Sequence, residues 1–455
     1  MSSSRARMAG FGLVALACSS PSASIQVTTN GDTTVFTADP AVTTIEVDAI
    51  DQTGANDGVL LQPTSPQSAA SFDLGDPSSS LVASLQLTGK DAAGDAVVFG
   101  ATPFVELGAL DGSTVQLFVQ RRHGFATMPG AMTDARTKPL LATVGEALYW
   151  VGGSIAGVTN PLNLGGYDLL YLDQFDTQCG TSANATSFAL VTLTQQNSDG
   201  DYAYAALLDA SGAALSYIGL PGCDDATFDG GIAANLPKGL DSWSEVEGGQ
   251  TVMGDDGTAY VVGASKLDAP SSAILALHPD ASVTALASTS RQGAATALAP
   301  GGGIFLYGGS AAEGAAEIVE SSGEYALRGD YAPDATMGLA AVQFDSKTML
   351  VAGGTNPPLK IDLTCGGGCA AVPFGKGLPM ALQSSSLFAL GGSAFLIVGD
   401  DATGATHAFR LDGGDDVPPE IPLQIPRQGA RAIQTSTGAI VIVGGGSATP
   451  ESYVD

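Results

Sequence analysis

The sequence has little positive charge, few histidines and few aromatic residues, and each shortage weighs against a class of function. Its 455 residues include 17 Lys and Arg against 46 Asp and Glu, which gives a formal net charge of −29. So acidic a surface repels phosphate backbones, which excludes binding to nucleic acid. Three histidines, His123, His278 and His407, leave little material for metal binding or acid–base chemistry. Aromatic residues make up only 6% of the chain, which disfavours a sugar site built from stacked rings.

The familiar catalytic motifs are also missing. The sequence has no Gly-x-Ser-x-Gly before a helical pattern, no phosphate-binding P-loop and no identifiable carboxylate pair. Helical periodicity is absent after the first eighteen residues, so we expect an all-β protein. At 44% apolar residues the chain has enough material for a folded core.

One short polar segment is a candidate for calcium. Asn197, Asp199 and Asp201 place oxygen ligands at alternate positions. A complete EF-type loop also needs Gly at its sixth position and an acid at its twelfth, where this chain has Tyr202 and Leu208. The segment therefore predicts a polar hairpin turn, with calcium as the weaker alternative, and we expect no other cofactor.

Long apolar runs are absent, and the first eighteen residues carry the longest one. Arg5 and Arg7 precede the apolar run Met8–Ala17, which is too short to span a bilayer and is typical of a signal peptide. Cys18 follows directly, and this junction resembles the lipobox of bacterial lipoproteins. The resemblance implies a lipidated Cys18 and, from Ser19, a place in the Gram-negative outer membrane, on a side that the sequence does not indicate. The alternative is an ordinary cleaved signal peptide with an incidental cysteine.

The remaining cysteines are even in number. They are Cys179, Cys223, Cys365 and Cys369, and four cysteines in an exported chain allow three disulfide pairings. We favour Cys365 with Cys369, across a loop of three glycines, and Cys179 with Cys223. A metal site at the first pair is the weaker interpretation, because zinc takes four ligands.

Glycine is abundant, with 60 residues, and it marks an internal repeat. Short apolar runs end in Gly or Gly-Gly, at Gly152, Gly153, Gly263, Gly308, Gly309, Gly353, Gly354, Gly399, Gly444 and Gly445. From Gly263 onward the first glycines recur at intervals of 45, 45, 46 and 45 residues. The longer interval before Gly263 fits two units, the missing one centred on Tyr202–Leu208. The repeat therefore counts seven units.

A period of this length with several strands per unit is typical of a β-propeller blade, and a β-helix has much shorter coils. Three units also carry an arginine 16 or 17 residues before the first glycine, at Arg136, Arg291 and Arg427. These features resemble a kelch propeller of the galactose-oxidase central-domain type. The resemblance implies a seven-bladed ring over residues 113–455, with six blades as the alternative.

Residues 24–112 form a separate module in this interpretation. About seven short runs, among them Thr33–Ala38 and Thr44–Ile50, predict a small β-sandwich of immunoglobulin-like or transthyretin-like type. The predicted organisation is a signal peptide at 1–17, a lipidated tether at 18–23, the sandwich at 24–112 and the propeller at 113–455. Strands from 113–128, including Thr114–Arg122, are expected to close the ring by pairing with the last blade.

Two functions follow from this organisation. The first is a non-catalytic binding or scaffold protein on a lipid tether, which meets an unidentified protein or glycan through its propeller. The alternative is an exported carbohydrate-active enzyme with a site on the propeller loops. The scarcity of histidine and of catalytic motifs favours the first.

Overall fold

The computed structural model describes residues 23–455 apart from several short gaps. The gaps are 66–70, 76–80, 111–112, 133, 145–146, 156–157, 160–163, 178–186, 198–199, 210–213, 219–231, 234–235, 279–281, 311–315, 329–330, 332–335 and 367–368. The described chain is almost entirely β-structure, as expected. No helix within it is long and apolar enough to cross a membrane.

Two sheets make up the N-terminal module. Their elements are β1 (Ala23–Thr28), β2 (Thr44–Asp51), β3 (Asn56–Thr64), β4 (Ser71–Gly75), β5 (Val82–Lys90), β6 (Ala96–Ala101), β7 (Val105–Glu106), the 3₁₀-helix η1 (Leu107–Leu110), β8 (Thr114–Phe118) and β9 (Gln120–Arg121). One sheet has the order β4-β1-β8, and the other has the order β3-β2-β5-β6-β9 with β7 paired to β5.

A single core lies between these sheets. Ile25 and Val115 from the first sheet and Val47, Leu85 and Val98 from the second are all fully buried in it. The expected alternation is present in β2, where every second side chain is buried. The two sheets therefore pack face to face.

Three expectations for this region are wrong. Thr33–Ala38 forms turns instead of a strand, because the Asp32 carboxylate accepts hydrogen bonds from the Thr34 amide and hydroxyl and so favours a turn. Thr114–Phe118 does not help to close the ring, because it pairs in parallel with β1. β9 likewise pairs with β6, so the N-terminal sheets continue to Arg121 instead of ending at residue 112.

The rest of the chain folds into seven successive sheets, counted over the described residues. The first three contain β11 (Leu140–Val144), β12 (Ala147–Val151), β15 (Leu164–Asp168) and β16 (Asp173–Thr177); β17 (Ser187–Asn197), β18 (Gly200–Asp209), β19 (Ala214–Ile218) and β20 (Ile232–Ala233); and β21 (Gln250–Met253), β22 (Ala259–Val262), β23 (Ser271–Leu277) and β24 (Val283–Arg291). The next three contain β25 (Ala295–Leu298), β26 (Ile304–Tyr307), β27 (Ala316–Val319) and β28 (Tyr325–Arg328); β29 (Ala340–Asp345), β30 (Thr348–Ala352), β31 (Leu359–Asp362) and β32 (Val372–Pro373); and β33 (Gln383–Gly391), β34 (Ala394–Asp400) and β35 (Thr406–Leu411). The last combines β36 (Ala430–Gln434), β37 (Ile440–Gly444) and β38 (Glu451–Val454) with β10 (Gly124–Thr127). A small pair, β13 (Ser154–Ile155) and β14 (Val158–Thr159), and two 3₁₀-helices, η2 (Trp243–Glu245) and η3 (Gly263–Ser265), lie in the connections.

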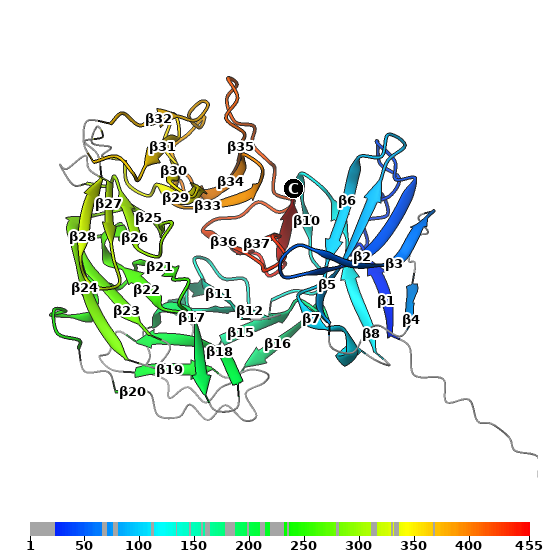
Figure 1. Cartoon of the computed structure of the whole chain (residues 1–455), viewed down its shortest axis with the longest axis horizontal. Coiled ribbons are helices and arrows are strands. Elements are labelled where there is room, and N and C mark those ends of the chain that lie inside the picture. The colour runs from blue at the N-terminus through cyan, green and yellow to red at the C-terminus, as the bar shows by residue number, and fades with distance from the viewer. Residues whose placement is uncertain are drawn as a thin grey trace, which may run out of the picture.

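These sheets are arranged in a ring about a common centre, beside the N-terminal module (Figure 1). This is the arrangement of a β-propeller. The innermost strand of each sheet faces the centre, and the second strand is the apolar run of the repeat. β12, β22, β26 and β37 are buried along their whole length, because neighbouring sheets pack on both of their faces.

The last sheet joins the two ends of the ring. β38 lies between β37 and β10, so a strand that precedes the first sheet completes the last one. Phe125 of β10 packs against Tyr453 of β38, with ring centroids 5.4 Å apart. Of the residues up to Met128 that were expected to close the ring, only Gly124–Thr127 pair with the last sheet.

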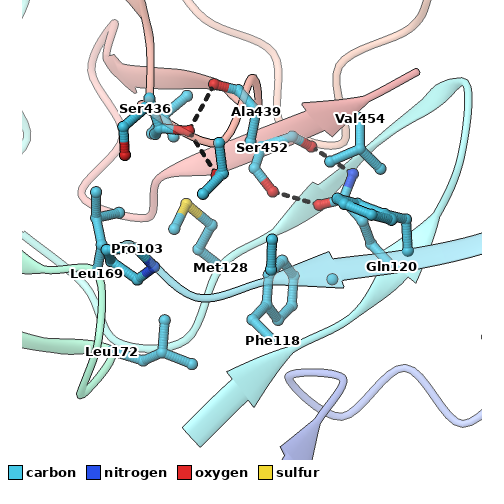
Figure 2. A pocket seen from close by; sticks show the side chains of 16 residues that line it. Pro103, Phe118, Gln120, Met128, Leu169, Leu172, Ser436, Ala439, Ser452 and Val454 are labelled. Carbon is cyan, nitrogen blue, oxygen red and sulfur yellow. Dashed lines mark hydrogen bonds between the residues drawn. The ribbon is translucent and has the colours of Figure 1, made fainter. Parts of the chain in front are cut away.

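The C-terminus lies where the ring meets the N-terminal module (Figure 1). Between them is a small apolar cavity of about 50 Å³, lined by Phe118, Leu172 and Val454 among others. At its edge Gln120 Nε2 donates to the Ser452 carbonyl at 3.0 Å, and the Ser452 hydroxyl donates to Gln120 Oε1 (Figure 2). Its lining comes from both the N-terminal module and the ring, so this small cavity is part of the packing between them.

Candidate functional site

A large cavity lies at the centre of the ring. Its volume is about 640 Å³, within the range of small-molecule sites. It is lined by the innermost strands β11, β21, β25, β29, β33 and β36 and by the residues just before them. The polar residues that line it are Lys138, Thr143, Gln250, Thr251, Ser265, Thr296, Ser384, Ser385, Ser386 and Arg431. The described lining therefore offers hydroxyls, an amide and two cations.

One mouth of this channel is built from a second repeating position. Six innermost strands have a left-handed residue at or just before their start: Lys138, Gly248, Gly293, Gly338, Ser384 and Gly429. Four of the six are glycines, which adopt positive φ without steric cost. Lys138 and Ser384 hold the same conformation, with φ of 51° each. For a side chain with a Cβ this conformation costs about 1 kcal/mol, a strain that is found disproportionately at functional positions.

Backbone hydrogen bonds connect neighbouring sheets at this mouth. The Lys138 amide donates to the Gly429 carbonyl at 2.6 Å, and the Gly338 amide donates to the Gly293 carbonyl at 2.9 Å. The Gly338 carbonyl in turn accepts from the amide and hydroxyl of Ser385. The left-handed conformation turns these amides and carbonyls toward the next sheet. The mouth is thus a rigid frame.

The repeat arginines lie behind this frame and are buried. Arg427 donates from Nη1 to the Gly444 carbonyl at 2.6 Å, and Arg291 donates in the same way to Gly308 at 3.1 Å. Arg136 reaches Gly152 at 3.4 Å. Each guanidinium is 3% exposed or less. The arginines therefore fix the turn after the second strand and do not line the channel.

Two of these arginines contact a buried glutamate from the third strand of the sheet that follows them in the chain. Glu451 accepts from Arg427 Nε at 3.0 Å and Nη2 at 2.8 Å, while Glu317 Oε2 lies 3.6 Å from Arg291 Nε. Both glutamates are fully buried. In the first sheet Gly165 occupies the equivalent place opposite Trp150, because a Cβ there would lie 2.1 Å from the indole nitrogen.

The repeat glycines have a steric reason as well. At Gly445, where φ is 72°, a Cβ would lie 2.6 Å from the Cβ of Arg427. At Gly309, where φ is 82°, it would lie 2.6 Å from the carbonyl of Gln292, the residue after Arg291. In both sheets the second glycine of the pair therefore leaves room for the chain at the repeat arginine or at the residue after it.

The three histidines lie apart and outside the described channel lining. His123 contacts Asp455 at 3.1 Å, and His278 lies between two threonine hydroxyls. His407 contacts Glu420 at 2.7 Å and lies 3.5 Å from Asp401. The pKa of Asp401 is lowered to about 2, first by the hydrogen bond from the Thr403 hydroxyl. These contacts tie surface loops together.

Several predicted site residues fall outside the described residues. Cys18, Cys179 and Cys223 lie there, and so does Asp199 of the calcium candidate. Asn197 and Asp201 lie on β17 and β18, on either side of a tight hairpin. Over the part of the chain that the structure describes, no three metal-binding side chains gather. Calcium binding by this segment stays a prediction.

The other predicted cysteine pair lies within the described residues. Cys365 and Cys369 are joined in a disulfide after β31, with their Cα atoms 6.3 Å apart. The bond lies in a peripheral loop, far along the sheet from its innermost strand β29.

The sequence interpretation missed Lys138 and Arg431, the two cations of the channel. A signal was present, since positions 248, 293, 338, 384 and 429 recur at the same intervals as the repeat glycines. The spacing alone did not predict a left-handed residue at these positions, because residue type does not show that a lysine or serine adopts the conformation of a glycine.

Comparisons with known proteins identify no family for this chain. No protein-family model matches the chain, and no curated protein matches it in sequence. Among solved structures, the chain is similar to a streptogramin B lyase (12% identity, 72% of this chain and 97% of that chain, TM-score 0.47). It is also similar to a virginiamycin B lyase from Staphylococcus aureus (12%, 72% and 98%, 0.47) and to a quinoprotein alcohol dehydrogenase-like protein from Bacteroides thetaiotaomicron (9%, 85% and 89%, 0.41). These neighbours are β-propeller-like proteins, but similarities this weak support no conclusion about the fold or the site of this chain.

Proposed function

We propose that this protein is a non-catalytic binding protein of the bacterial cell envelope, held to the outer membrane by a lipid on Cys18. In this proposal a seven-bladed, kelch-like propeller follows a small β-sandwich and binds its ligand through the central channel. The seven sheets and the buried arginines that bind the Gly-Gly turns support the kelch-like assignment.

One observation carries the binding role. The channel is large enough for a small molecule, and its described lining combines hydroxyls, an amide and two cations on a hydrogen-bonded frame. Such a wall recognises polar ligands without rearranging. Nothing in this proposal requires a reaction at the site.

The binding role is tested by screening the mature protein against glycan and peptide arrays, with an activity screen alongside. We expect saturable binding and unchanged ligand. Turnover of a bound glycan would replace this proposal with the carbohydrate-active enzyme.

The anchor gives a separate prediction. Replacing Cys18 with serine should move the protein from the membrane fraction to the soluble fraction, because the attached lipid is the proposed membrane contact. Mass spectrometry of the membrane-extracted wild type should show an acylated N-terminal cysteine. A wild-type mass that fits a cleaved but unmodified chain would contradict the anchor.

A further inference from the structure

The central channel is lined by two cationic side chains, although the chain as a whole is strongly acidic. The protein has 46 acidic residues and 17 basic ones, yet the described channel lining contains Lys138 and Arg431 and no carboxylate. Both come from the same side of the ring, since β11 and β36 belong to adjacent sheets and the Lys138 amide bonds to Gly429. The channel wall is thus locally positive.

The side chain of Lys138 is directed toward the sheet that carries Arg431. A Cβ placed on Gly429 would lie 3.0 Å from Lys138 Cγ and 3.5 Å from Cε, so the lysine stem runs across the face of this glycine. Arg431 follows Gly429 by two residues on the same strand. The lysine stem therefore lies beside the start of the strand that carries Arg431. Among the described residues no carboxylate forms an ion pair with the Lys138 ammonium group.

The guanidinium of Arg431 is fixed by hydrogen bonds from one of its nitrogens, Nη1. Its Nη1 donates to the buried carboxylate of Asp400 at 3.0 Å and to the Ala430 carbonyl at 2.7 Å. Asp400 is itself oriented by the Thr406 hydroxyl at 2.8 Å. Nε and Nη2 have no acceptor among the described residues, and the side chain is 24% exposed. A guanidinium fixed in this way offers two parallel donors, the arrangement that binds an oxyanion.

We infer that this side of the channel mouth binds the oxyanion, carboxylate or phosphate, of a small hydroxylated ligand. Lys138 supplies a point charge and Arg431 supplies two directed donors, while Thr251 and Ser386 of the same cavity provide hydroxyl partners for the neutral part. The inference rests on the proposed binding function and adds to it the chemistry of the ligand.

The test uses three probes that share one sugar ring. Glucuronate presents a carboxylate, glucose 6-phosphate presents a phosphate, and glucose presents neither. Calorimetry on the mature wild-type protein at low salt should show at least one anionic probe binding about tenfold or more tightly than glucose, the gain expected from a charge-assisted hydrogen bond. The preferred probe tells carboxylate from phosphate, and its affinity should fall as salt is raised.

The decisive variant is Lys138→Gly. Glycine is the residue at this position in four other sheets, at Gly248, Gly293, Gly338 and Gly429, so the substitution suits the left-handed backbone and should leave the melting temperature unchanged or higher. Affinity for the anionic probe should fall about tenfold, and Lys138→Arg should restore part of it. Lys347→Gln removes an equal charge from an exposed turn outside the channel and should leave affinity unchanged.

Equal affinity for glucose and both anions, or no binding of any probe, overturns the inference. So does an affinity that Lys138→Gly leaves intact. These results leave the broader binding role to the array experiment. Conversely, anion binding followed by conversion of the probe supports the oxyanion site and refutes the non-catalytic function, so the two failures are distinguishable.

Discussion

Replacing Arg427 with methionine should lower the free energy of unfolding by about 3–5 kcal/mol, because it leaves a buried carboxylate without its counter-charge. Glu451 is fully buried and accepts two hydrogen bonds from this guanidinium. Arg427 also holds the carbonyls of Gly444 and Thr449. Removing the arginine therefore uncouples the Gly-Gly turn from the last strand. Urea unfolding followed by the fluorescence of Trp150 and Trp243 measures the loss.

Arg136→Met is the matched control. This arginine has the same place in its sheet, but Gly165 replaces the glutamate, and its acidic neighbour Asp134 is 27% exposed. Water can solvate that carboxylate after the substitution, so the cost should be clearly smaller. Equal losses in the two variants would show that the arginines act by packing alone. Arg427→Met combined with Glu451→Leu should recover part of the stability, since both charges are then gone.

How far the sequence predicts this fold is clearest at the repeat. The interval of 45 residues locates the second strand of each sheet, and the arginine spacing selects three buried guanidiniums before any coordinate is known. Both features can be recognised in the sequence because each consists of a given residue type at a fixed separation. Lys138 and Ser384 adopt the left-handed conformation that glycines adopt at the equivalent positions of other sheets, and their residue types do not indicate it.

Strand pairing shows the other limit. Thr114–Phe118 has the alternation of a half-buried strand, and that alternation is the same whether the strand closes the ring or joins the N-terminal sheet. Its actual partner, β1, is about ninety residues earlier in the chain. Long-range pairing depends on which buried faces fit together, and a local pattern does not contain that information. The short strand Gly124–Thr127, which does close the ring, has almost no pattern at all.

Deleting residues 451–455 should have a still larger effect than Arg427→Met and should abolish cooperative folding of the ring. The deletion removes β38, which is bonded to β37 on one side and to β10 on the other. It exposes two strand edges, empties the site of the fully buried Tyr453 and leaves Arg427 without Glu451. Together these losses exceed about 5 kcal/mol, which is comparable to the whole stability of many folded domains. Thermal melting followed by circular dichroism and limited proteolysis measure the outcome.

Deleting Asp455 alone separates strand pairing from the charges at the C-terminus. Arg410 and His123 lose the carboxylate that they contact at 3.2 and 3.1 Å, while every backbone pair of β38 is kept. Burial raises the pKa of this carboxyl, but the hydrogen bond and charge of Arg410 outweigh it and hold the pKa below its ordinary value. Its partners Arg410 and His123 are partly exposed, so these ion pairs should contribute about 1 kcal/mol. If β38 closes the ring, the free energy of unfolding should fall much more for the chain ending at residue 450 than for the chain ending at residue 454. The reason is that the loss of β38 separates β37 from β10 and so opens the ring. Equal melting temperatures for the full chain and the chain ending at residue 450 would mean that the ring is held by something other than this strand.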